Sequence, residues 1–164
     1  MGRGPPYDHM ARKITAPALR RFMNLWPPFL FAGIRVRELS DDFRHARVEL
    51  RLHWYNRNFV GTHFGGSLFA MTDPFWMLMI LHLLGDDSIV WARAAAIEFE
   101  SPGRSTVHAE FLVTDAMLDD LRTAAANGDK VLRWFDTEVR DVHGALVARV
   151  RKQVYVRMKR GRTP

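Results

Sequence analysis

The sequence predicts an α+β protein in which a curved antiparallel sheet of about six strands wraps around one long buried helix, after a short N-terminal helix. Two observations carry this prediction. Residues 67–84 are apolar on every side, which indicates a helix with almost no solvated face. Segments on both sides of this run alternate apolar and polar residues with the period typical of strands. The helix therefore has a sheet available to cover it.

The strand candidates fall into two groups. Residues 34–39 and 43–52 form a predicted hairpin before the helix, and the strands after it are predicted at 89–99, 106–113, 131–140 and 146–158. In the last strand the alternate apolar face is interrupted by Lys152. Its stem would have to snorkel, or its charge would have to be paired.

Two further helices and the chain ends complete the predicted domain. Residues 17–26 have apolar residues at helical spacing before a Pro pair, and residues 115–127 form a second short helix with Asp115 as its cap and Gly128 at its end. We expect residues 1–14 to be a disordered leader and 159–164 a basic tail. Residues 15–158 then form a single domain, for which 164 residues with 48% hydrophobic content suffice.

Composition narrows the classes of function. The chain has no Cys, which fits a reducing compartment, and we expect a cytoplasmic protein. Its net charge of +6 points to an anionic partner or to a solvated basic surface, and no nucleic-acid motif accompanies the basic residues. The apolar run contains Asp73, Pro74 and His82, which favours a core helix over a membrane span.

Asp73 is the one carboxylate in the apolar run and the best catalytic candidate. Apolar neighbours should desolvate it and make it a better proton acceptor near neutral pH. The alternative is a local structural purpose, because Pro74 lacks an N–H group and frees a carbonyl one turn back. Both interpretations stay open from the sequence.

The motif N-x-x-G-x-x-x-G-G, from Asn58 to Gly66, leads into the apolar helix. Together with the strands that follow, it resembles the hotdog-fold acyl-CoA thioesterases. Within that fold, N-L-W-P-P-F, residues 54–76 and Y-V-R resemble the DUF4442 branch. The resemblance implies a hotdog fold and hydrolysis of an acyl-CoA or acyl-carrier thioester to the acid and thiol. The alternatives are a non-catalytic acyl-CoA or lipid-binding protein and, ranked last, a hydratase or dehydratase.

The resemblance also implies roles for the motif residues. Asn58 falls where phenylacetyl-CoA-type thioesterases begin their loop with Asn, to orient water or to close the loop. Gly65 and Gly66 fall on the pair whose backbone N–H holds the thioester oxygen, and Asp73 falls on the helix carboxylate. This chain has Phe64 where better-studied members have His. His63 lies one residue earlier and is a weaker candidate for a general base.

Spacing predicts that two chains build the site. Gly65 and Asp73 are eight residues apart, about 12 Å along a helix axis, so one helix cannot bring both to the same carbonyl. We therefore expect a homodimer, or a tetramer built as a dimer of dimers, in which the Gly pair of one subunit faces Asp73 of the other.

The remaining site predictions concern substrate binding. We expect coenzyme A as part of the substrate, no separate cofactor and no metal, because the histidines lack ligand spacing. Arginines on one face of the last strand would bind the coenzyme A phosphates, with a solvated face as the alternative. The residues expected to contact substrate are His63, Phe64, Ser67, Phe69, Trp76, Arg149, Arg151 and Arg157.

Overall fold

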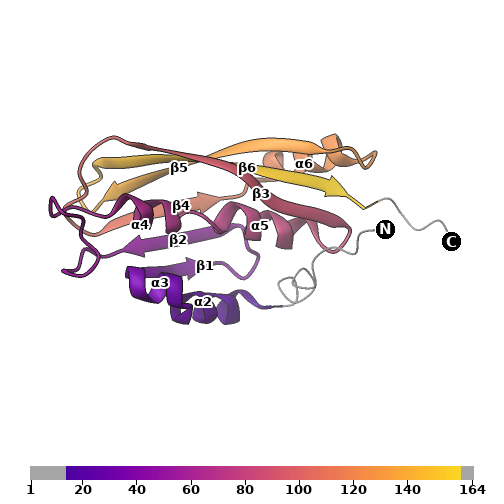
Figure 1. Cartoon of the computed structure of the whole chain (residues 1–164). Coiled ribbons are helices and arrows are strands. Elements are labelled where there is room, and N and C mark those ends of the chain that lie inside the picture. Colours follow the sequence, from indigo (N-terminus) through magenta and orange to yellow (C-terminus); the bar gives the residue numbers. More distant parts are fainter. Residues whose placement is uncertain (1–13, 160–164) are drawn as a thin grey trace.

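Six antiparallel strands form one sheet in the order β1-β2-β4-β5-β6-β3. This computed structural model describes residues 14–159, so the predicted leader and basic tail lie almost entirely outside the described residues. The sheet curves around the helical segment α4–α5, which lies in its concave side (Figure 1). The predicted architecture is confirmed.

All predicted strands are present, because alternating sequences place one face of each strand in the core. The hairpin strands pair with each other, and the last strand lies between β5 and β3. The bounds of the strands are β1 Ile34–Leu39, β2 His45–Leu50, β3 Ser88–Phe99, β4 Val107–Leu112, β5 Val131–Asp141 and β6 Leu146–Met158.

The central helix is interrupted, which corrects the prediction of one continuous helix. It consists of α4 (Gly65–Ala70) and α5 (Phe75–Leu84), separated by the turn at residues 71–74. The cause is Pro74, which has no N–H to donate to the carbonyl of Ala70. The Asp73 N–H bonds that carbonyl over 3.3 Å instead, so the last turn of α4 tightens before α5 begins.

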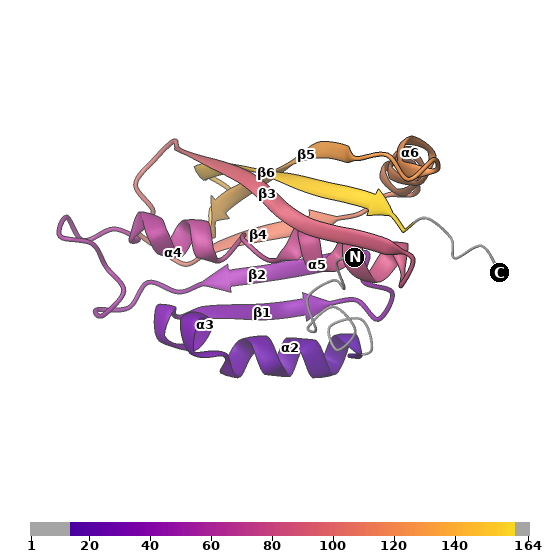
Figure 2. The same ribbon diagram turned by 45° about the vertical axis from the view of Figure 1, so that its right-hand side comes forward.

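The other helices lie beside the sheet. Helices α2 (Ala16–Leu25) and α3 (Pro27–Ala32) lie along the edge strand β1, and α6 (Asp115–Ala125) contacts α5, β5 and β6 (Figure 2). The predicted cap of α6 is wrong by one residue. Thr114 is the cap, because its hydroxyl accepts from Met117 N–H over 3.3 Å, and Asp115 is in the first turn.

The central helix is buried only on the side that faces the sheet. Phe75, Met79 and Ile80 are buried in the core, whereas Phe69, Asp73 and Met77 lie on a side that stays partly or largely exposed. The predicted absence of a solvated face is therefore wrong for the single chain. The Gly65–Leu84 segment is apolar and long enough to cross a membrane, but 56% of its most apolar window is buried in the fold, as in a core helix.

Candidate functional site

The start of α4 offers backbone N–H groups to a ligand. Phe64 is the N-terminal boundary residue, and its side chain makes no capping hydrogen bond. Within residues 14–159, the N–H groups of Gly65 and Gly66 donate to no protein acceptor, as expected for the first turn of a helix. Such groups favour a negatively charged oxygen.

A cavity of about 430 Å³ opens beside Gly65. The loop before α4 forms one wall, and the segment between β3 and β4 forms the other. Its lining residues are Asn58, Val60, Thr62, His63, Gly65, Leu68, Phe99, Glu100, Ser101, Pro102, Gly103 and Arg104. The cavity is large enough for part of a small organic ligand next to the free amide of Gly65.

Asn58 closes the loop that leads to α4. Its side-chain N–H groups donate to the Thr62 hydroxyl (2.8 Å) and the His63 carbonyl (3.3 Å), and its oxygen accepts from the N–H groups of Val60 and Thr62. All four hydrogen-bonding positions of the amide are occupied. Of the two interpretations from the sequence, loop closure is the one that these bonds describe.

His63 connects the two walls of the cavity. Its backbone N–H donates to the Gly103 carbonyl (2.9 Å), and its ring Nε2 donates to the Ser105 carbonyl (2.7 Å). The side chain is 3% exposed, and Nδ1 has no partner among the described residues. Burial lowers the pKa of His63 below its ordinary value of 6.5, against the opposing effect of the bond to Ser105. The neutral ring is therefore a structural link between the walls.

Phe64 and Phe99 cover the Gly pair. A Cβ atom on Gly66 would overlap the Phe64 ring, and one on Gly65 would lie 2.8 Å from the Phe99 ring. Both rings are more than half exposed. The two rings form an exposed apolar rim around the Gly pair, and the absence of side chains at both glycines leaves room for the rings.

Asp73 lies at the helix break rather than in the core, which corrects the predicted desolvation. Its side chain is 56% exposed because the 71–74 turn directs it away from the core. Its Oδ1 accepts a short hydrogen bond from Nζ of Lys152, whose side chain is 4% exposed. The charge of Lys152 is therefore paired, which is one of the two alternatives predicted for this residue from the sequence. Asp73 does not line the cavity beside Gly65 of its own chain.

The other predicted contacts on the central helix differ in exposure. Ser67 is buried in α4, and Phe69 is partly buried, with its ring centroid 5.3 Å from Nζ of Lys152. Trp76 is in the core, where its Nε1–H donates to the Thr137 hydroxyl over 2.7 Å. None of these three residues lines the cavity.

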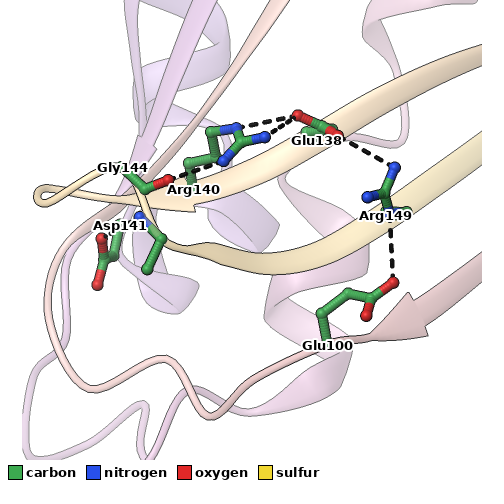
Figure 3. A network of polar contacts seen from close by, with 7 residues as sticks. Glu100, Glu138, Arg140, Asp141, Gly144 and Arg149 are labelled. Atoms are coloured by element: carbon green, nitrogen blue, oxygen red, sulfur yellow. Dashed lines mark hydrogen bonds and ion pairs between the residues drawn. The ribbon is translucent and has the colours of Figure 1, made fainter.

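The predicted phosphate-binding arginines lie on the outer face of the sheet, and each has an intramolecular partner. Arg149 pairs with Glu100 (3.2 Å) and Glu138 (3.1 Å), within the network shown in Figure 3. The guanidinium of Arg151 lies 5.6 Å from the Trp134 ring centroid. Arg157 donates to the Gly128 carbonyl over 3.0 Å. The predicted phosphate contacts of these arginines therefore compete with contacts inside the chain.

The second wall of the cavity was not predicted from the sequence. Residue 99 ends a predicted strand and residues 100–104 lie between two predicted strands, and only the pairing of β3 with β6 places them opposite Gly65. Asn56 was not predicted either; it is a buried amide that donates to the carbonyls of Ala32 and Arg51. A buried metal cluster is not formed: among residues 14–159, no group of three or more His, Asp or Glu side chains could hold a metal ion.

A sheet curved around a central helix, with a cavity at the start of that helix, defines a protein of the hotdog fold. The chain belongs to the family described as "domain of unknown function (DUF4442)", whose sequence profile matches residues 16–156. A search of curated proteins finds no sequence that matches this chain.

Solved structures share this fold at low sequence identity. A probable thioesterase from Pseudomonas aeruginosa matches with a TM-score of 0.74 and 18% identity over 96% of this chain and 99% of that one. A thioesterase from Haemophilus influenzae matches with a TM-score of 0.64 and 13% identity over 94% and 98%. A hypothetical thioesterase from Streptococcus pneumoniae, solved with coenzyme A, matches with 0.55 and 16% over 80% and 91%.

Proposed function

We propose that the protein hydrolyses an acyl-CoA or acyl-carrier thioester to the free acid and the thiol. The observation that carries this proposal is the cavity of about 430 Å³ beside the unbonded N–H of Gly65. Three similar structures are named as a probable thioesterase, a thioesterase and a hypothetical thioesterase, and the last was solved with coenzyme A, which supports the same class of substrate.

The chemistry requires an oxyanion site and a base. The Gly65 N–H would donate to the thioester oxygen, where negative charge develops in the transition state. The Asp73 carboxylate would take a proton from water as the water oxygen attacks the carbonyl carbon. The C–S bond then breaks, and the proton passes to the departing thiolate. The exposed apolar rings of Phe64 and Phe99 would contact the acyl group.

A second copy of the chain would supply the base, Asp73. Asp73 does not line the cavity of its own chain, and it lies on the half-exposed side of the central helix. Strand β3 is an edge strand that pairs only with β6 among the described residues, and Ala92 and Ala94 on it are exposed. A long edge of small residues is suited to pairing with another strand. We therefore propose a homodimer through β3 that brings Asp73 of one copy to Gly65 of the other.

Release of free thiol from a panel of acyl-CoAs of different chain length tests this function. Gly65→Pro removes the N–H that would bind the oxygen, and Pro is tolerated at the first position of a helix. Phe64 already has φ −64° and ψ 126°, the backbone conformation that a following Pro requires. We expect turnover to fall about 10²- to 10³-fold.

Gly65→Ala is the matched control, because it adds the same Cβ contact with the Phe99 ring and keeps the N–H. It should retain most of the activity. Equal loss in both variants would show that space around Gly65, and not its N–H, matters. No thiol release from the unmodified protein with any acyl-CoA would contradict the proposed hydrolysis.

A second candidate function is non-catalytic binding of acyl-CoA. It is favoured by Phe64, whose ring covers Gly66 where an imidazole would otherwise stand, and by the absence of Asp73 from the cavity. Calorimetry separates the two functions. Binding of acyl-CoA without release of thiol over hours supports the binding protein.

A further inference from the structure

Lys152 is a buried cation with a specific partner. It interrupts the apolar face of β6, between Val150 and Val154, and its side chain is 4% exposed. Burying an ammonium group is costly unless the charge is compensated. Its Nζ donates to the carboxylate oxygen Oδ1 of Asp73 and lies 5.3 Å from the centroid of the Phe69 ring. The core of the domain thus holds a charge at the one place where the central helix breaks.

The two partners of this ion pair are not equivalent. Lys152 has almost no contact with solvent, whereas Asp73 is 56% exposed. Oδ1 of Asp73 accepts from Lys152, and Oδ2 has no partner among the described residues. Oδ1 is therefore held by the buried Lys152, and Oδ2 is available on the exposed side of the helix.

We propose that Lys152 is a positioning residue that orients the Asp73 carboxylate. This inference rests on the proposed hydrolysis, in which Asp73 takes a proton from water. A side chain at a helix break samples several orientations unless something holds it, and catalysis depends on a fixed geometry of the base. Because the Lys152 ammonium binds Oδ1, Oδ2 is the oxygen that would face the reacting water.

Because Lys152 is buried and Asp73 is exposed, replacing one or the other should change the stability of the protein differently. In Lys152→Met, an apolar side chain of similar length fills the buried space, and Asp73 remains in contact with solvent. In Asp73→Asn, the Lys152 ammonium stays buried without its counter-charge. The midpoint of thermal unfolding should therefore stay equal or rise for Lys152→Met and fall for Asp73→Asn. The double variant should recover the loss.

The test measures kcat and KM for acyl-CoA hydrolysis beside those unfolding midpoints. We expect Lys152→Met to lower kcat about 10- to 100-fold with KM nearly unchanged, because the base is misplaced and not removed. Lys152→Arg, which keeps a cation at this place, should retain more of the kcat than Lys152→Met. The double variant should be no slower than Asp73→Asn alone, since both changes act through one carboxylate.

The outcomes separate the two proposals. A folded Lys152→Met variant with the kcat of the unmodified protein would overturn the positioning role and leave the proposed hydrolysis standing. An unmodified protein that releases no thiol would overturn the hydrolysis and, with it, the role of Lys152. A lower kcat for Lys152→Met that is multiplied further in the double variant would overturn action through Asp73.

Discussion

His63 shows how a single residue before the Gly pair combines two tasks. It was a candidate for substrate binding, yet its ring and its backbone N–H both bond to the opposite wall of the cavity. The buried ring is held neutral, because protonation of Nδ1 would place a charge where no partner exists among the described residues. The same bonds fix the position of Gly65 two residues later.

Acid should therefore weaken the fold through His63. Its folded pKa lies below the unfolded value of 6.5, so the unfolded chain binds more protons as the pH falls through that value. We expect the free energy of unfolding to decrease between about pH 7 and pH 5, by at most about 1.4 kcal/mol per pH unit from this group. Urea titrations at several pH values measure it.

His63→Gln is the control, since an amide can keep the bond to the Ser105 carbonyl and does not titrate. Its stability should depend less on pH in that interval. An identical slope in both proteins would show that His63 does not cause the acid sensitivity.

At the scale of elements, the β1–β2 hairpin depends on one carboxylate. Glu49 on β2 accepts from Arg37 over 2.7 and 3.0 Å and from Arg51 over 2.6 Å. The bond from Arg37, with a further contribution from Arg51, lowers the pKa of Glu49 from 4.5 to about 2. Because the folded value is below the unfolded one, the stabilisation is complete above about pH 4.5 and is lost as the pH falls toward 2.

Glu49→Gln should reduce the free energy of unfolding by about 1–2 kcal/mol at pH 7. The difference from the unmodified protein should become small as the pH falls to 2, where Glu49 is protonated in the unfolded chain and about half protonated in the folded one. Chemical denaturation at the two pH values measures it. A difference that persists unchanged at low pH would contradict a role for the ionised carboxylate.

The elements also show what could be read from the sequence. The strands and the helices α2 and α6 could be predicted from the spacing of apolar residues and from capping residues, because these signals act within a few residues, whereas α3 was not predicted. The central helix was predicted as unbroken, although Pro74 was visible, since a continuous apolar run hid the interruption. The Lys152–Asp73 pair joins residues 79 positions apart, and the Arg149 contacts join β6 to β5 and to Glu100, the residue after β3. Such partners depend on sheet register, which local patterns do not reveal.

At the scale of the whole molecule, the edge strand β3 predicts the state of assembly. Ala92 and Ala94 are exposed on this edge, so replacing both with Lys places several like charges along the proposed interface without disturbing the core. Light scattering after gel filtration should show a dimer for the unmodified protein and a monomer for this variant. Ala116 on α6 and Ala126, the residue after this helix, are also exposed, and the same replacement there should leave the dimer intact. Equal masses for both double variants would contradict an interface at β3.

Mixing two inactive variants tests the central claim most directly, which is that Gly65 of one copy and Asp73 of another build one hydrolytic site. Gly65→Pro and Asp73→Asn/Lys152→Met, a pair of changes that avoids a buried unpaired charge, should each be nearly inactive alone. When they are unfolded together and refolded in equal amounts, half of the dimers carry one intact site, so about a quarter of the unmodified thiol-release rate should return. A mixture as inactive as its two components would contradict the shared site.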